Sequence, residues 1–398
     1  MNGFGILSFV LLASAPLCAQ AVMAGLKGGR AAPLFPTDAA VLEMREVKNS
    51  LPCGVTPTRT ELGFDFVFQA GYAARVRLRD LVDAGNSLTA IFRVTSDSSP
   101  ERPVYFEQKW SVPPLAAHAA GVAELVGAFN VGEGDYQVDW LLRDRQERVC
   151  SAFWRTSARM PIKAGAVTAG LPAGSITSAG TEPDAAHESS NGAADRRLAV
   201  SVLLNIGPGT PGATTISPAQ TDALLAILRS ITREPRVGSI SVTAFNLEHR
   251  QVIFQEEAMR RVNFAGLKKA IGSLSLGTVS VGELADNSAE ARFLVRLAAE
   301  QAARKRPDAL IFVGPKSADE AAMTRDILTQ LGDARCPVFY LHYAPDPSLN
   351  PWRDLIGSAV KYWRGREFSI SRPVDFASAW SKIMSQLGRS NALLAPER

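Results

Sequence analysis

The chain has 398 residues, of which 46% are hydrophobic, and carries a formal net charge of +4. This length is typical of two domains, and the apolar content is ample for packed cores. The small net charge argues against a nucleic-acid-binding surface. The one tight basic run, Arg304-Lys305-Arg306, ends a predicted helix, where cations complement the helix dipole.

The N-terminus predicts export. Residues 6–17 form an apolar run too short to span a bilayer comfortably, and Ala19-Gln20-Ala21 offers a small-x-small cleavage site, so residues 1–21 are typical of a signal peptide. No Lys or Arg precedes the run, which leaves a weak signal or a misassigned start codon as alternatives. No other stretch approaches the roughly 20 apolar residues of a transmembrane helix. We expect a periplasmic or extracellular protein without a membrane span.

Three cysteines remain once the expected signal peptide, which carries Cys18, is removed. Cys53 and Cys150 bracket the first half of the chain, and we expect a disulfide between them in an oxidising compartment. Cys336 precedes Pro337 at the start of an apolar strand, where we expect a buried, unreactive thiol.

Residues 40–162 show the alternation of apolar and polar residues that is typical of short strands. The predicted strands, separated by turn residues, are 61–68, 87–95, 104–112, 136–142 and 149–154. Short strands at near-regular spacing indicate an all-β sandwich. Gly134-Asp135-Tyr136 resembles the way in which bacterial immunoglobulin-like modules enter a late strand. Residues 163–196 then contain no aromatic residue, and we expect them to form a flexible linker because they cannot bury enough apolar surface to offset ordering entropy.

The second half of the chain has a different periodicity of apolar residues from the first half. Residues 198–204 are a continuous apolar run, as in a strand buried on both faces. Ser217-Pro218 begins a helix, and Gln220 completes a capping box. The other predicted strands are 239–247, an antiparallel return at 251–255, 308–313 and 337–343; the other predicted helices are 263–274, 288–305, 318–331, one begun by Asn350-Pro351, and 374–387. This alternation predicts an α/β fold with a doubly wound, mostly parallel, Rossmann-like sheet.

Residues 207–212, Gly-Pro-Gly-Thr-Pro-Gly, match the G-x-G-x-x-G spacing of a dinucleotide-binding loop. The helix that should hold the pyrophosphate starts only near Pro218, and Pro208 and Pro211 remove two backbone N–H groups. The acidic residue expected after the next strand is displaced to Glu248. We therefore expect neither a nucleotide nor another cofactor.

The order of elements over residues 197–390 resembles the von Willebrand factor type A domain, in particular the divergent A-type domains of exported bacterial proteins. In that family a loop reading Asp-x-Ser-x-Ser, a Thr from a second loop and an Asp after a later strand hold Mg²⁺, which prefers hard oxygen ligands. Asn205 falls at the first Asp position, Gly207 and Gly209 fall at the Ser positions, and Gly314 falls at the later Asp position. The resemblance implies a degenerate site and a metal-independent domain.

The second metal loop of the family corresponds to residues 277–288, where Thr278, Ser280 and Ser288 give no clear match. Lys316 lies beside the place of the ion. Its ammonium group either takes over the charge role of the metal or is solvated. Glu283 and Asp286 either pair with Lys316 or are solvated.

Enzyme motifs are absent from the sequence. It has no G-x-S-x-G, H-E-x-x-H or C-x-x-C motif, and the histidines His118, His187, His249 and His342 are scattered. His342 ends a predicted strand at the ligand-facing edge of the sheet, so it is the histidine to examine; a structural role is the alternative.

Two functions remain. The first is an exported, non-enzymatic protein-binding or adhesion-type module, whose contact candidates are Asn205, Thr210, Glu283, Asp286, Lys316, Tyr343 and Trp352. Tyr343 and Trp352 would supply apolar contact area, or pack locally. The alternative is a periplasmic enzyme with an unrecognised site. The partner is another protein, which the sequence does not identify, and the oligomeric state is equally open.

Overall fold

The computed structural model describes residues 21–23, 34–82, 87–116, 118–161, 169–179, 197–209, 213, 215–273, 288–304, 307–317, 323–346, 348 and 351–394. The chain divides into two compact units. The first comprises Met1–Leu62, Val67–Met160 and Thr168–Asp184, and the second comprises Gly63–Phe66, Pro161–Val167 and Ala185–Arg398. Among the described residues, none of the helices is both long and apolar enough to cross a bilayer.

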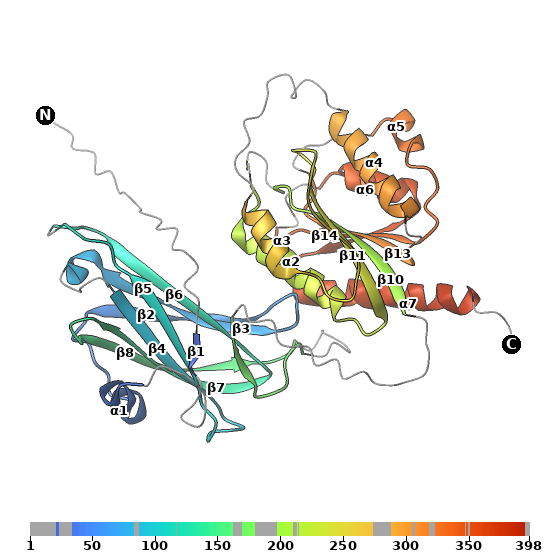
Figure 1. Ribbon diagram of the computed structural model, residues 1–398. Coiled ribbons are helices and arrows are strands. Elements are labelled where there is room, and N and C mark those ends of the chain that lie inside the picture. The colour runs from blue at the N-terminus through green and yellow to red at the C-terminus, as the bar shows by residue number, and fades with distance from the viewer. Residues whose placement is uncertain are drawn as a thin grey trace, which may run out of the picture. The chain divides into compact units, whose positions relative to one another are not determined.

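The first unit contains two antiparallel sheets (Figure 1). One has the order β1-β5-β4-β7-β8, with β1 Ala21–Met23, β4 Ser87–Ser96, β5 Val104–Ser111, β7 Gly134–Asp144 and β8 Val149–Ala158. The other has the order β2-β3-β6-β9, with β2 Cys53–Leu62, β3 Phe68–Arg77, β6 Val122–Val131 and β9 Ile176–Ser178. Side chains from both sheets share one core, whose largest members include Tyr72, Phe92, Phe106, Phe129 and Trp140.

One predicted strand of this unit is wrong. Residues 61–68 are not a single strand, because β2 ends at Leu62 and the chain turns before β3 begins at Phe68. The N–H of Phe66 donates to the carbonyl of Gly63 at 2.9 Å, and Phe66 has φ 60°. The alternating phenylalanines therefore mark a hairpin turn rather than a pleated face. Strands β3 and β6 are not predicted at all, because Ala and Gly interrupt their apolar alternation.

A helix also departs from the all-β expectation. Helix α1 (Pro36–Met44) begins with Pro in its first turn, and Val41 and Leu42 pack against Ile91 and Leu141 of the five-stranded sheet. A short 3₁₀ turn, Leu78–Leu81, follows β3.

The predicted disulfide is confirmed. Cys53 on β2 and Cys150 on β8 are bonded, with their Cα atoms 6.1 Å apart. Because β2 and β8 are edge strands of different sheets, the crosslink joins the two sheets at one margin of the unit. A disulfide of this kind is compatible with an exported protein.

The entry into β7 is fixed by Tyr136. Its hydroxyl donates to the carbonyl of Gly132 at 2.9 Å, four residues upstream, and Gly134 between them has φ 153°. A tyrosine that hydrogen-bonds back to the preceding corner is found in immunoglobulin-type sandwiches.

Part of the predicted linker is ordered, which corrects the expectation of one flexible segment over residues 163–196. Ile176–Ser178 form β9 and pair with β6, because Ile176 and Leu171 supply apolar side chains that the small-residue composition obscures. Residues 162–168 and 180–196 lie outside the described part of the chain, as do residues 1–20 of the expected signal peptide.

The second unit is built on a six-stranded sheet with the order β12-β11-β10-β13-β14-β15. Its strands are β10 Leu198–Asn205, β11 Val237–Asn246, β12 Gln251–Met259, β13 Ala309–Gly314, β14 Val338–Tyr343 and β15 Arg366–Ile370. All pairs are parallel except β11 with β12. This is the 3-2-1-4-5-6 order of doubly wound sheets.

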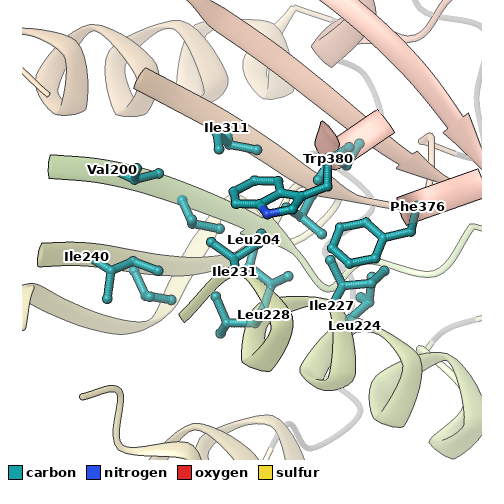
Figure 2. Close-up of a cluster of buried hydrophobic side chains, with 14 of the residues drawn as sticks. Val200, Leu204, Leu224, Ile227, Leu228, Ile231, Ile240, Ile311, Phe376 and Trp380 are labelled. Carbon is teal, nitrogen blue, oxygen red and sulfur yellow. The ribbon is translucent and has the colours of Figure 1, made fainter. Parts of the chain in front are cut away.

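Helices cover both faces of that sheet (Figure 1). On one face lie α2 (Pro218–Thr232), α3 (Phe264–Gly272) and α7 (Pro373–Leu394); Leu224, Ile227, Phe376 and Trp380 meet Leu204 there (Figure 2). On the other face lie α4 (Ala289–Arg304), α5 (Arg325–Thr329) and α6 (Leu355–Tyr362). The capping box of Ser217 and Gln220 is confirmed at the start of α2.

One helix prediction is wrong, and another is confirmed only in part. The helix expected from Asn350-Pro351 begins instead after Asp354, whose carboxylate caps α6 by accepting from the N–H of Gly357. The helix expected over 318–331 is reduced to α5 within the described residues. The edge strand β15 is not predicted, because it is short and carries Arg366 and Glu367.

Candidate functional site at the carboxyl edge of the parallel sheet

The glycine loop begins with a buried asparagine. Asn205, 2% exposed, ends β10, and its side-chain amide donates to the carbonyl of Pro315 at 3.0 Å. Its Oδ1 accepts from the N–H of Gly207 at 3.1 Å. Because β10 and β13 are adjacent parallel strands, their carboxyl ends meet here. In doubly wound sheets this edge forms the crevice where ligands bind. Here the Asn205 side chain bridges the two strand ends, and we call this bridged edge the closed crevice.

Glycines make the closure sterically feasible. Gly314 has φ 145°, and a Cβ atom there would lie 2.4 Å from the carbonyl oxygen of Asn205. A Cβ atom on Gly209 would lie 2.5 Å from the Cβ of Pro315. Side chains that donate oxygen to a metal therefore have no room at Gly209 or Gly314 in this backbone. At Gly207 the corresponding distance to Oδ1 of Asn205 is 3.2 Å, which is tight.

Lys316 is anchored rather than solvated, so the solvated interpretation is wrong. Its side chain is 11% exposed, and Nζ donates to the carbonyl of Trp352 at 2.8 Å and lies 3.5 Å from Oε1 of Glu367. The ammonium group thus joins the loop after β13 to the loop before α6 and to β15. Among the described residues, the opposite charge is supplied by Glu367; the two expected partners, Glu283 and Asp286, lie outside them.

Asp354 is the centre of the network behind that loop. It is fully buried, and its carboxylate accepts from the N–H groups of Gly357 at 2.8 Å and Ser317 at 3.2 Å. The hydroxyl of Tyr340 lies 3.3 Å from Asp354 and 3.1 Å from the carbonyl of Pro315. Burial raises the pKa of Asp354 to about 6, against the lowering effect of the two N–H donors. The single hydroxyl proton of Tyr340 faces two acceptors, Asp354 and the carbonyl of Pro315. When Asp354 is protonated, it can donate to the Tyr340 oxygen, and Tyr340 can then donate its own proton to Pro315.

His342 is not poised for acid–base chemistry near neutral pH. Its ring is buried, and burial, together with the charge of Lys316, lowers its pKa to about 4. A general acid or base works best with a pKa near the operating pH. The structural interpretation of this histidine is therefore the better one.

The residues predicted to contact a partner differ in how exposed they are. Asn205 and Tyr343 are buried, so neither offers a surface to a partner in this conformation. Trp352 is partly buried, and its indole Nε1 is enclosed without a hydrogen-bond partner in the described part of the chain. Thr210, Glu283 and Asp286 lie outside the described residues.

Sequence reasoning missed the acidic half of this network. Asp354 and Glu367 follow no motif, but an Asp three residues before Gly357 at the start of an apolar helix is an N-cap pattern that was available in the sequence. Among the described residues of this edge, the loop after β14 is exposed at Pro345, Asp346, Ser348, Pro351 and Arg353. Three or more His, Cys, Asp or Glu side chains do not converge on a potential metal position anywhere in the described residues.

The thiol of Cys336 is free and only partly buried, which modifies the expectation of a buried one. Burial nevertheless raises its pKa to about 11, so the reactive thiolate is scarce near neutral pH.

Comparisons with known proteins leave the family open. No family model matches the chain, and no curated protein matches it. Solved structures similar to it include the β-glucuronidase of Bacteroides uniformis, with 11% identity and a TM-score of 0.19 over 73% of this chain and 36% of that chain. A glycosyl hydrolase family 2 member from Bacteroides cellulosilyticus shares 10% identity, with a TM-score of 0.19, over 79% of this chain and 38% of that chain. The chain thus spans well under half the length of these structures, and superpositions this weak identify neither its fold nor an activity.

Proposed function

We propose that the second unit is a metal-independent protein-binding domain of an exported protein, similar to a von Willebrand factor type A domain. The observation that carries the proposal is the closed crevice at the carboxyl ends of β10 and β13. There the polar side chains of Asn205, Lys316 and Asp354 bond to the protein itself. Groups that are satisfied internally are not available to orient a substrate.

Topology supports the A-type resemblance. The antiparallel β12, between β11 and α3, is the return strand on which that resemblance rests. The remaining helix–strand units then add β13, β14 and β15 on the far side of β10. The disulfide of the first unit fits the proposed export.

The residues at the family's metal positions do not fit Mg²⁺. The ion wants near-octahedral hard oxygen ligands, with carboxylate charge to offset its dehydration. Asn205 offers a neutral amide already bonded on both ends, and Gly209 and Gly314 have no space for a side chain. Partner binding in this proposal therefore involves no metal bridge.

The proposed contact surface is the loop after β14. Its exposed residues include Asp346 and Arg353, and Asp346 accepts from the N–H of Ser348 at 2.9 Å, which orders the turn. Loops that follow the strands are the usual contact surface of doubly wound sheets. The enzyme alternative has less support, because His342 is held neutral and Asp354 is enclosed.

Affinity capture tests the proposal, with the full exported chain as bait in native envelope extract. We expect a protein partner that is retained equally in Mg²⁺ and in chelator, and that is lost with Arg353→Glu. The matched control is Arg335→Glu, an exposed arginine in the loop that enters β14 at the opposite edge of the sheet. Capture that requires Mg²⁺, or that both variants leave unchanged, contradicts the proposal.

A further inference from the structure

A cavity of about 320 Å³ lies at the other end of the sheet, over the amino-terminal halves of β10 and β11. Its walls include Ser201, Ser239 and Ser241 from the two strands, Gln301 from α4, Ala258 from β12, and Pro307. All of them belong to the second unit. The cavity is far along the strands from Asn205, so it is separate from the closed crevice.

Small side chains create this space. Ser201 pairs with Ser241 and Ala199 pairs with Ser239 in the parallel register, which sets these residues side by side on the face that α4 covers. Further along the same face the strands carry Leu203 and Phe245, and Phe245 packs on Phe293 of α4, with ring centroids 6.3 Å apart. The two phenylalanine rings therefore hold α4 away from the sheet near the carboxyl ends of the strands. Near the amino ends of the strands, the small serine side chains leave the space between α4 and the sheet unfilled.

The polar groups of the cavity are buried but poorly matched to one another. Ser201 is 4% exposed and Gln301 is 7% exposed, and Oγ of Ser201 lies 3.5 Å from Oε1 of Gln301, at the limit of hydrogen bonding. Within the described part of the chain this is the one hydrogen bond of the Gln301 side chain, and Gln301 lines the cavity. Ser241 accepts from the N–H of Ala258 at 3.0 Å and keeps its hydroxyl proton to donate. The Gln301 nitrogen is not among the enclosed, unpaired side-chain atoms of the described residues, so a small molecule can reach it.

The chemistry of the side chains that line the cavity indicates which kind of ligand it can bind. The cavity presents three hydroxyl groups and one carboxamide, the methyl group of Ala258 and the ring of Pro307, and none of the described residues that line it is charged. Each polar group is both donor and acceptor, or can be oriented as either, which suits a ligand whose hydroxyl groups also donate and accept. Ligand pockets begin at roughly 300 Å³. We infer that this cavity is a binding site for an uncharged, hydroxyl-rich ligand of monosaccharide size, independent of the protein-binding function proposed above.

The test is calorimetric titration of the full chain with glucose, galactose and N-acetylglucosamine, each alone, with glucuronate as the charged comparison. We expect saturable binding of at least one neutral sugar at millimolar or lower concentration, and weaker or no binding of glucuronate. Gln301→Met keeps the side-chain volume and removes the amide, so the dissociation constant should rise about tenfold. Ser239→Leu fills the cavity and should abolish binding. Gln386→Met, a partly buried glutamine of α7 on the opposite face, is the control and should bind as wild type.

Ligand-free stability separates a binding role from a structural one. If the Gln301 amide awaits a ligand, Gln301→Met keeps or raises the melting temperature, because an unpaired buried polar group is replaced by an apolar one. A fall of several degrees means that the amide is already bonded in the protein and overturns the inference. Absence of saturable binding for all three neutral sugars, or binding that survives Ser239→Leu, also overturns it.

Discussion

The side-chain amide of Asn205 spans the carboxyl ends of β10 and β13 to reach the carbonyl of Pro315 at 3.0 Å. This bond occupies the position where a doubly wound sheet usually opens to a ligand. Gly314, whose φ of 145° lets the carbonyl of Asn205 pass close by, makes the approach possible. The closed crevice is thus a property of specific residues, and it can be tested by changing them.

Asn205→Ala should lower the free energy of unfolding by about 2 kcal/mol, because the N–H of Gly207 loses its buried acceptor and Pro315 loses one of two donors. Urea denaturation of the full chain measures this. Asn130→Ala is the matched control; its amide donates to Ser178 at 3.3 Å from a partly exposed position, where water replaces it, so the loss should be about 0.5 kcal/mol. Equal losses for the two variants would mean that Asn205 is not the closing residue.

Gly314→Ala should be among the most destabilising single substitutions in the second unit, at about 3 kcal/mol, because a positive φ and a 2.4 Å overlap with backbone act together. Gly332→Ala is the control, since Gly332 has φ 62° but nothing within 4 Å of the added methyl group. It should cost about 1 kcal/mol. The same denaturation series checks both, and a smaller loss for Gly314→Ala than for Gly332→Ala would show that the close approach is absent.

The stability of the protein should respond to two buried groups in opposite senses. The folded-state pKa of Asp354 is raised to about 6 from 3.8, so the folded protein binds more protons between these values and stability falls as pH rises through them. The folded-state pKa of His342 is lowered to about 4 from 6.5, so the unfolded chain binds more protons and stability rises with pH over that window. Each contribution is on the order of 3 kcal/mol.

Single variants separate the two effects. Relative to wild type, Asp354→Asn should make the free energy of unfolding rise more steeply from pH 4 to pH 6, while Asn still caps α6. His342→Leu should make the free energy of unfolding fall over the same pH range. Urea melts at several pH values measure both slopes. If both variants change the pH dependence of the free energy of unfolding in the same direction, or leave it unchanged, the burial of Asp354 and His342 is contradicted.

Reduction of Cys53–Cys150 should lower the stability of the first unit by about 2–5 kcal/mol, as expected for a loop of sequence separation 97. Cys336→Ala, the control, should cost about 1 kcal/mol. Intact mass after alkylation gives an independent check. In the unreduced, unfolded chain without residues 1–21, only Cys336 should be modified; in the folded chain its modification should be slow, because its pKa is raised to about 11. Alkylation of Cys150 without reductant would contradict the crosslink.

Strong local patterns predicted much of the second unit. The continuous apolar run before Asn205 and the Ser217–Gln220 capping box each specify their element from neighbouring residues alone. The edge strand β15 was not predicted. Arg366 and Glu367 are tolerated there because one side of an edge strand faces solvent, so no apolar run marks this strand in the sequence. Similarly, the phenylalanines of residues 61–68 alternate without forming a strand, because a turn at Phe66 intervenes.

The candidate site was harder to predict, because its contacts join residues far apart in the chain. The sequence placed Asn205 and Gly314 at the carboxyl ends of two buried strands, and the structure brings these two residues together. The pairing of Lys316 with Glu367 and the enclosure of Asp354 depend on how loops from three strands meet. No local spacing encodes such an arrangement.

The most direct test of the closed, metal-independent crevice is the melting temperature of the full chain in millimolar Mg²⁺ or Mn²⁺ compared with chelator. A metal bound only by the folded state, at 100 times its dissociation constant, would add about 2.7 kcal/mol. For a unit of this size that is several degrees. We predict no change in the unfolding transition of the second unit, because Asn205 brings no charge and Gly314 has no room for a ligand. A reproducible upward shift in Mg²⁺ that chelator reverses would contradict the account.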